Sequence, residues 1–253
     1  MNLHEFDAWC RAFLEISALV GIDDSVNGIQ VGRSGGDIRK VAFAVDACSE
    51  TIRRAAESSA DLLFVHHGMF WGKSERIDGA MLERVKALVL SDIALYACHL
   101  PLDKNSEVGN NAVLADLIGL QDRKPFGFYH GVPIGVSGRL KTPSTIGDIA
   151  AAVLPDGSAP RSLIPAGPAK IETAAIVSGG APFEILEAIG AGFDLYLTGE
   201  PSHSIYHHIL ENRINFIAAG HYATEVWGVK AVASKLSRET GIEALFIDAP
   251  TGL

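Results

Sequence analysis

The sequence predicts an α/β protein made of two similar, intertwined halves with mostly parallel sheets, and three observations support this prediction. Short apolar runs suited to buried strands alternate with amphipathic segments along most of the chain, which is typical of α/β units. The segments that begin at Asp61 and Asp194 resemble each other, and each leads from an apolar run into a polar cluster. The length of 253 residues is enough for one large or two ordinary domains.

The expected elements follow from the spacing of apolar residues. An amphipathic helix opens the chain over about residues 3–20, and Ser49 is expected to cap the helix that follows the first strand. The middle of the chain, 121–170, is richer in Gly and Pro and is expected to be a connecting region. The remaining strands are expected at 41–45, 62–65, 93–97, 132–140, 174–177, 195–198, 216–219 and 244–247, and the remaining helices at 80–90, 110–118, 145–153, 182–189, 204–210 and 223–237.

The two halves are expected to comprise residues 1–125 and 126–253 and to form one compact unit. Residues 61–67 align with 194–200, and residues 93–103 align with 216–225. The second alignment places His99 opposite His221, and each histidine stands four residues before a carboxylate. This recurrence favours an internal duplication over a chance similarity between two α/β units.

Composition narrows the range of partners and compartments. The formal net charge of −9 does not favour a nucleic acid as partner, because phosphate binding requires a basic surface. The three cysteines are widely spaced, which speaks against a disulfide framework and for a reducing cytosol. We expect no signal peptide, and no apolar run approaches the roughly eighteen residues of a membrane helix. The composition therefore predicts a cytoplasmic protein.

Five side chains form one candidate metal site, and they follow three of the expected strands, where open α/β sheets bind ligands. Three imidazoles and two carboxylates suit zinc, iron, manganese, cobalt or nickel better than calcium or magnesium. Two divalent ions are expected, since one ion with five protein ligands would be nearly closed to a substrate. Taken singly, each of these residues could equally be an ordinary structural residue. The candidate ligands are His66, His67, Asp103, His221 and Glu225.

Local spacing suggests how these side chains could converge. The two adjacent histidines would point to opposite faces of an extended strand, so Gly68 is expected to supply unusual backbone angles that let them diverge beyond the strand end. Pro101 is expected to keep the acidic ligand that follows it in a loop. His221 and Glu225 are four residues apart and would share one face at the start of a helix.

Three further residues are candidate catalytic groups. His99 could orient a metal ligand or carry protons. Glu200 and His203 could line the same cavity or simply begin a helix. Hydrogen bonds from the preceding turn could come from Asp24, Asn27 and Gln30. The sequence contains no Walker-type phosphate loop, no Gly-x-Ser-x-Gly elbow and no dinucleotide-binding glycine motif after a strand.

Six motifs, in order along nearly the whole chain, resemble those of the GTP cyclohydrolase I type 2 homologues, also called NIF-three-like proteins, in their short bacterial form. They are Asn27-Gly-Ile-Gln-Val31, Val65-His-His-Gly-Met-Phe-Trp71, His99-Leu-Pro-Leu-Asp103, Gly109-Asn-Asn-Ala112, Thr198-Gly-Glu200 and Gly220-His-Tyr-Ala-Thr-Glu225. The resemblance implies a dinuclear metal centre between two similar halves, with the five ligands named above and Glu225 as the bridge. It also implies a toroidal homohexamer and, from the family name, opening of the guanine imidazole ring of GTP.

These observations favour a metal-dependent hydrolase that activates water between two ions and acts on a small molecule, with a nucleotide among the candidates. No side-chain nucleophile accompanies the ligand set, and two ions would supply both the activated water and the stabilisation of a developing oxyanion. The alternative is a non-catalytic metal-binding or regulatory scaffold, since coordination alone fits both. A DNA-associated factor fits poorly with the acidic charge.

Overall fold

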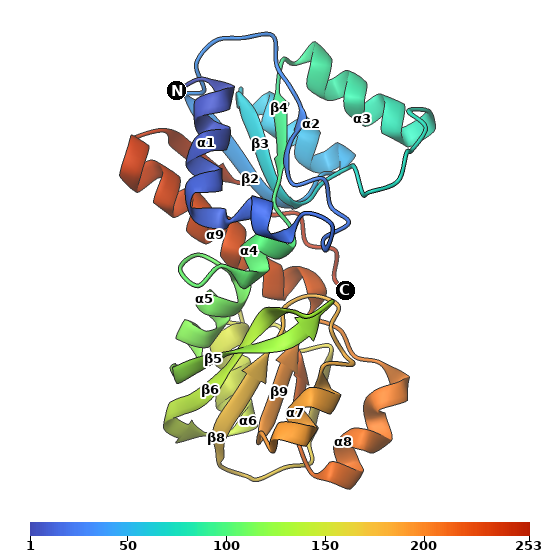
Figure 1. Ribbon diagram of the computed structural model, residues 1–253, viewed down its shortest axis with the longest axis vertical. Coiled ribbons are helices and arrows are strands. Elements are labelled where there is room, and N and C mark those ends of the chain that lie inside the picture. The colour runs from blue at the N-terminus through green and yellow to red at the C-terminus, as the bar shows by residue number, and fades with distance from the viewer. The chain divides into compact units, whose positions relative to one another are not determined.

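The computed structural model describes residues 1–253 and divides them into two compact α/β units (Figure 1). Unit 1 comprises Met1–Val108 and Gly228–Ala249, and unit 2 comprises Gly109–Trp227 and Pro250–Leu253. The extents differ from the expected halves because the C-terminal part of the chain is shared. Helix α9 (His221–Thr240) begins in unit 2, and its later turns together with strand β11 (Glu243–Phe246) belong to unit 1.

Unit 1 contains a five-stranded sheet in the order β1-β4-β3-β2-β11. Strands β4, β3, β2 and β11 run parallel and β1 pairs antiparallel at the edge, so the expected mostly parallel sheet is confirmed here. The strands are β1 (Gly28–Val31), β2 (Lys40–Asp46), β3 (Leu62–His67) and β4 (Ala94–Ala97). The helices are α1 (Leu3–Leu14), the 3-10 turn η1 (Ile16–Leu19), α2 (Ser49–Glu57), α3 (Gly79–Leu90) and α4 (Leu100–Lys104).

Both faces of the unit 1 sheet are buried. On one face Phe43, Phe64 and Tyr96 form a row of rings whose neighbouring centroids are 5.2 and 5.6 Å apart. Phe6 of α1 packs edge-on against Tyr96 at 5.4 Å. On the other face, alternate strand residues such as Ala42 form a second hydrophobic cluster together with buried side chains of α2 and α3. Burial on both faces explains why these strands appear in the sequence as continuous apolar runs.

Unit 2 contains a six-stranded sheet in the order β5-β6-β8-β9-β10-β7. Only β8, β9 and β10 run parallel; the flanking strands are antiparallel, so this sheet is mixed rather than mostly parallel. Its strands are β5 (Leu120–Tyr129), β6 (Val132–Ser144), β7 (Ser162–Pro165), β8 (Ile171–Ile176), β9 (Leu195–Thr198) and β10 (Asn215–Ala218). Its helices are α5 (Asn110–Leu117), α6 (Ile146–Val153), α7 (Ile185–Ala191), η2 (His203–Ile205) and α8 (Tyr206–Asn212).

The segment 121–170 is more than a connection. It supplies β5, β6, α6 and β7, three of the six strands of the unit 2 sheet and one of its helices. Most other expected elements are present with ends shifted by a few residues. The opening helix stops at Leu14, because Glu15 adopts a left-handed conformation at φ 51°, and Cys48 rather than Ser49 occupies the N-cap of α2. No helix combines the length and apolar character needed to cross a membrane.

The parallel cores of the two units repeat each other in detail. The Asp61 carboxylate accepts a hydrogen bond from the backbone N–H of Lys40 in β2 at 3.0 Å. The Asp194 carboxylate accepts the corresponding bond from Thr173 in β8 at 2.9 Å. Each aspartate directly precedes the next strand of its own sheet, β3 or β9. The same side chain therefore performs the same structural task in both halves, as the alignment of residues 61–67 with 194–200 predicts.

The second predicted alignment is displaced by one residue. Strand β4 begins at Ala94 and β10 at Asn215, and each of these residues pairs with the first residue of the neighbouring parallel strand. Counting from these positions, His99 corresponds to Gly220 and not to His221. The two stretches occupy equivalent places in their sheets. The histidines in them do not, so the matched spacing of histidine and carboxylate is not a structural correspondence.

Candidate metal centre

Three imidazoles gather in unit 1 at the carboxyl ends of β3 and β4. His66 and His67 are the last two residues of β3, and His99 follows β4. The ring centroids of His66 and His67 are 4.7 Å apart, and that of His99 lies 5.1 and 5.6 Å from them. One ligand atom from each residue lies within 4.8 Å of the others. Although both adjacent histidines belong to the strand and not to the loop beyond it, they reach a common region.

Gly68 serves a purpose different from the predicted one. Its φ is not positive, so it supplies no unusual backbone angle. Instead, a Cβ built on Gly68 would lie 2.4 Å from the side-chain amide of Gln30. That amide accepts a hydrogen bond from the backbone N–H of Met69 at 2.7 Å and donates to the carbonyl of Val26 at 2.9 Å. Glycine is required here because Gln30 ties β1 to the segment after the two histidines.

His66 is fully buried, and both of its nitrogens face polar atoms of unit 1. Its Nδ1 lies 2.9 Å from the carbonyl oxygen of Cys98, and its Nε2 lies 3.4 Å from Oδ2 of Asp103. Asp103 belongs to the short helix α4 and not to a loop, because Pro101 falls in the first turn of that helix, where a missing N–H costs nothing. The structure thus brings together two of the predicted ligands and corrects the local conformation of one.

Two carboxylates that sequence reasoning missed hold the other two imidazoles. Nδ1 of His67 lies 2.8 Å from Oδ1 of Asp46, and Nδ1 of His99 lies 2.9 Å from Oδ1 of Asp23. A carboxylate at Nδ1 fixes the ring and favours the tautomer that presents Nε2, an arrangement common behind metal-binding histidines. In the sequence, Asp46 is marked only by its place at the end of an apolar run, and Asp23 only by its place in an acidic turn. Neither pattern is specific to a residue that holds a histidine.

In unit 2, His221 begins helix α9 and Glu225 follows one turn later, as predicted. Nε2 of His221 lies 3.1 Å from Oε1 of Glu225, and its Nδ1 lies 2.5 Å from Oε1 of Glu200. Burial alone would lower the pKa of His221, but the hydrogen bonds and charges of Glu225 and Glu200 outweigh it and raise the pKa to about 9. The protonated form of His221 is therefore favoured at neutral pH, and its charge offsets one of the two carboxylates.

The backbone of unit 2 approaches these side chains closely. Gly179 has a φ of 68°, and its N–H donates to the hydroxyl of Thr224 at 2.9 Å. A Cβ on Gly179 would lie 2.3 Å from Oε1 of Glu225 and 3.3 Å from Nε2 of His221. A Cβ on Gly199 would lie 2.6 Å from the carbonyl oxygen of Gly179 and 2.8 Å from the α9 backbone. Two glycines thus make room for the carboxylate and the imidazole.

His203 stands apart from this group. It begins η2 with an exposed side chain, and no hydrogen bond or ion pair joins it to Glu200 or His221. Of the three candidate catalytic residues, His99 lies among the unit 1 imidazoles, Glu200 contacts a predicted ligand, and His203 is only near them in sequence.

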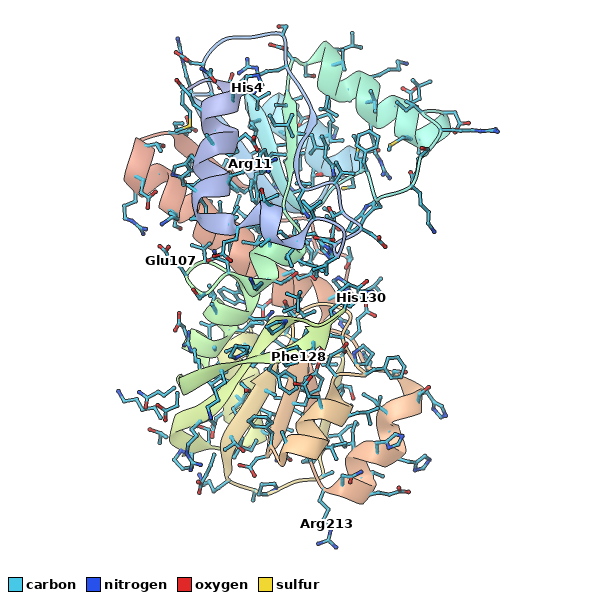
Figure 2. The ribbon with its side chains drawn as sticks, viewed as in Figure 1. His4, Arg11, Glu107, Phe128, His130 and Arg213 are labelled. Atoms are coloured by element: carbon cyan, nitrogen blue, oxygen red, sulfur yellow. The ribbon has the colours of Figure 1, made fainter.

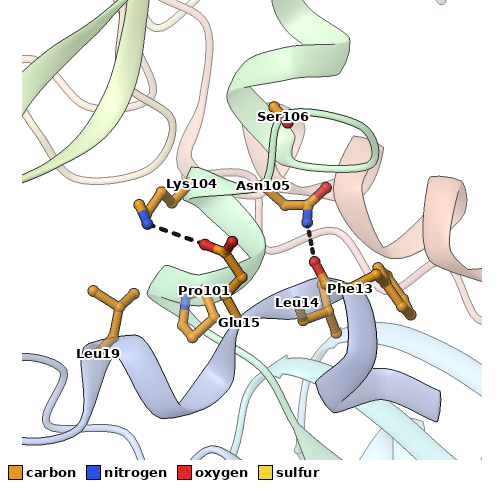
Figure 3. Close-up of a pocket in the computed structure, with 8 residues that line it drawn as sticks. All are labelled: Phe13, Leu14, Glu15, Leu19, Pro101, Lys104, Asn105 and Ser106. Carbon is orange, nitrogen blue, oxygen red and sulfur yellow. Dashed lines mark hydrogen bonds and ion pairs between the residues drawn. The ribbon is translucent and has the colours of Figure 1, made fainter.

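A cavity of about 280 Å³ in unit 1 lies beside α4 (Figure 3). Pro101 and Lys104 of α4 form one wall, and the Lys104 ammonium lies 3.3 Å from the Glu15 carboxylate. The Asn105 amide donates to the carbonyl of Phe13 at 2.7 Å across the same cavity. None of the three imidazoles lines this cavity, so it is distinct from their cluster.

The donor atoms in each unit fit divalent transition ions. In unit 1, the contacts at Nδ1 make Nε2 the atom that His66 and His67 would offer to a metal ion, and Asp103 adds a carboxylate beside His66. In unit 2, His221 and Glu225 offer a nitrogen and an oxygen on one helix face. This mixture of nitrogen and oxygen donors is the one that zinc, manganese, iron, cobalt and nickel accept.

Comparison with known proteins gives consistent matches over the full length. A family model described as Duf34/NIF3 (NGG1p interacting factor 3) matches residues 1–251. The chain is 42% identical to the GTP cyclohydrolase 1 type 2 homolog of Treponema pallidum and 43% identical to that of Archaeoglobus fulgidus, with 100% of both chains covered in each case. The solved structure of TTHA1606 from Thermus thermophilus is 39% identical with a TM-score of 0.90, and that of the protein ybgI, described as of unknown function, is 33% identical with a TM-score of 0.91; both cover 100% of each chain. The resemblance expected from the motifs and the predicted two-half α/β fold are both confirmed.

Proposed function

Since the chain belongs to the Duf34/NIF3 family, we propose that it binds two divalent metal ions and uses them to hydrolyse a small molecule. The proposed ligands are His66, His67, Asp103, His221 and Glu225, with Glu225 as the bridge. The observation that carries the proposal is the cluster of three imidazoles in unit 1, whose ligand atoms lie within 4.8 Å of one another and whose Nδ1 atoms all face oxygen atoms. A hydrogen-bond partner at Nδ1 is typical of metal-binding histidines and applies to the proposed ligands His66 and His67.

The two units offer complementary donors. Unit 1 offers imidazole nitrogens and one carboxylate, and unit 2 offers one imidazole and the proposed bridging carboxylate. The proposed ligand set, which the resemblance of the motifs implies, includes residues of each unit. Divalent ions held in this way lower the pKa of water and stabilise negative charge that develops on an oxygen.

The remaining polar residues have separate proposed tasks. Nδ1 of His99 is held by Asp23, which leaves Nε2 to exchange a proton with a reacting group. One oxygen of Glu200 holds His221, so this residue is proposed to orient a ligand first and to exchange protons through its other oxygen. His203 is a third proposed proton carrier, because it lies in the same short segment after β9 as Glu200.

A nucleotide is the proposed substrate class, and opening of the guanine imidazole ring of GTP is the first reaction to test. This proposal draws on the name GTP cyclohydrolase 1 type 2 homolog, which the similar Treponema and Archaeoglobus proteins carry. We also propose a toroidal homohexamer and a cytoplasmic location. The location is supported by the three cysteines, which are all free thiols.

The first experiment is metal analysis of protein purified without added metal, followed by a screen of the metal-loaded form on nucleotides, phosphoesters and amides. We expect about two equivalents of transition metal per chain and an activity that a chelator abolishes. His67→Ala should lose both. His4→Ala is the matched control, because His4 is an exposed imidazole on α1 (Figure 2).

The outcomes separate the proposal from its alternative. Bound metal without turnover across the panel would favour a regulatory or scaffold protein that binds metal. Protein that takes up no transition metal under any condition would refute both. The hexamer is tested by native mass spectrometry of the full chain, where a mass of one, two or three chains would refute it.

A further inference from the structure

The carboxylate of Asp23 takes part in hydrogen bonds through both of its oxygens. Its side chain is only 1% exposed. Oδ1 accepts from the backbone N–H of Ser25 at 2.9 Å and faces Nδ1 of His99 at 2.9 Å. Oδ2 accepts from the side-chain amide of Asn27 at 2.8 Å and from the backbone N–H of Leu100 at 3.0 Å. Both oxygens are thus held on two sides, and the carboxylate cannot rotate without breaking several bonds.

These contacts keep Asp23 ionised. Burial alone would raise the pKa of its carboxyl, but the hydrogen bond and charge of His99, together with Asn27 and Ser25, lower the pKa below its usual range. An ionised carboxylate is an acceptor only. The atom that faces it on the His99 ring must therefore carry a proton, which defines Nδ1–H as the favoured tautomer.

His99 is fixed at its backbone as well as at its ring. Its N–H donates to the side-chain oxygen of Asn27 at 2.7 Å, and its backbone lies outside the regular regions at φ −94° and ψ −111°. The Trp71 ring packs edge-on against the imidazole at 5.0 Å and is itself tied by a 3.0 Å hydrogen bond from its indole N–H to the carbonyl of Gly68. The ring is therefore held on its Nδ1 side by Asp23 and braced by an immobilised aromatic ring.

This arrangement leaves Nε2 of His99 as its reactive atom. The only hydrogen bond of the ring is made by Nδ1, and the side chain is 22% exposed. In the neutral form of the ring, a proton on Nδ1 leaves the lone pair on Nε2. That lone pair belongs to the cluster in which one ligand atom each of His66, His67 and His99 lies within 4.8 Å of the others.

We propose that Asp23 is a positioning residue that makes His99 the proton carrier of the reaction, by fixing the ring and holding its proton on Nδ1. This inference rests on the proposed hydrolytic function. Nε2 of His99 accepts one proton from the water that adds to the substrate and returns it to the leaving atom, so that the ring ends the cycle neutral. Asp23 stays ionised throughout, and the Nδ1 proton is never transferred, as in other aspartate–histidine pairs.

The competing explanation is that Asp23 has only a structural role, in which its hydrogen bonds connect the loop before β1 to the start of α4. Asp61 provides a matched control for that explanation. Its carboxylate also accepts backbone N–H groups of unit 1, from Arg39 at 2.8 Å and Lys40 at 3.0 Å, but it contacts no histidine. Asp61→Asn should therefore share the folding cost of Asp23→Asn without its effect on His99.

The first measurement uses metal-free full-length protein labelled with ¹⁵N at histidine, where nitrogen chemical shifts distinguish Nδ1–H from Nε2–H in a neutral ring. His99→Gln identifies the His99 signals by their disappearance. We expect Nδ1–H in the wild type and in Asp61→Asn, and a mixed or Nε2–H tautomer in Asp23→Asn. An unchanged tautomer in Asp23→Asn would overturn the proposal.

The second measurement is a double-mutant cycle on the metal-loaded protein with whichever substrate is turned over. Asp23→Asn should lower kcat by about 10- to 100-fold with KM nearly unchanged, the range found when partners of site histidines are removed. In the His99→Gln background the same substitution should have almost no further effect, since residues that act as a unit are not additive. Equal losses for Asp23→Asn and Asp61→Asn, or additive losses in the double variant, would contradict the proposal. If the loaded wild type turns over nothing, the proposed function fails, and the tautomer measurement alone decides the role of Asp23.

Discussion

Replacing Gly179 with alanine should have two effects, a strained backbone and a displaced carboxylate of the proposed ligand Glu225. A second glycine variant separates the two. With φ at 68°, an alanine at this position would have left-handed backbone angles, which cost roughly 1–2 kcal/mol for a residue with a Cβ. For a chain of this size the cost corresponds to a fall in Tm of about 2–8 °C. The same fall is expected from Gly192→Ala, since Gly192 has a φ of 73° and nothing within 4 Å of its Cβ position.

The two variants should differ in metal binding. The new Cβ at position 179 would lie 2.3 Å from Oε1 of Glu225, whereas ordinary contact begins at 3.4 Å. The carboxylate must therefore move by about 1 Å, a displacement that can cost on the order of a hundredfold at a functional site. The displaced atom is the end of a side chain, so the shift is a movement of the carboxylate and not of the helix backbone.

Calorimetric titration of the metal-free proteins with Zn²⁺ or Co²⁺ measures this difference directly. We expect Gly179→Ala to bind about 10- to 100-fold more weakly than the wild type and Gly192→Ala to bind like the wild type, while both melt at similar temperatures. Wild-type affinity in Gly179→Ala would refute the assignment of Glu225 as a ligand. Equal losses in both variants would show that backbone strain, and not the displaced carboxylate, weakens binding.

Three further predictions concern the same region. Asp46→Asn should weaken metal binding about 10- to 100-fold by freeing the His67 ring, measured by the same titration; unchanged affinity would argue against His67 as a ligand. Since the pKa of Asp23 is lowered in the folded state, its stabilisation is present above the unfolded pKa of about 3.9 and is lost as pH falls through the lower folded value. The difference in free energy of unfolding between wild type and Asp23→Asn, about 1–3 kcal/mol near neutral pH, should therefore shrink below about pH 4 in urea titrations, and a constant difference would contradict this. Chelation of the loaded protein should lower its Tm by several degrees, as expected when a ligand at about a hundred times its Kd contributes about 2.7 kcal/mol; an unchanged Tm would show that the folded state holds no such ion.

The sequence was sufficient to predict elements whose burial pattern is simple. Residues 62–65 of β3 and 195–197 of β9 are hydrophobic and fully buried, and polar residues stand where each of these runs ends. Strand β5 was not predicted because it lies at the edge of its sheet with five consecutive exposed residues. It also contains Pro125, which a central strand could not accommodate.

The partners of the histidines could not be predicted for a different reason. Asp23 meets His99 across 76 positions of sequence, and Asp46 meets His67 across 21. Such pairs depend on strand register and loop path, which neither composition nor spacing specifies. The same limit explains the displaced alignment of His99 with His221, because the pattern of a histidine followed by a carboxylate recurs one residue out of step with the strands.

Gly199 stands in unit 2 where His66 stands in unit 1, counting from the equivalent starts of β9 and β3. A single methyl group at Gly199 would already collide with the backbone of Gly179, so a histidine does not fit at that position while helix α9 keeps its present place. The two halves therefore differ at this equivalent position by more than a side chain, because the close passage of the backbone at Gly179 in unit 2 leaves no room for an imidazole there.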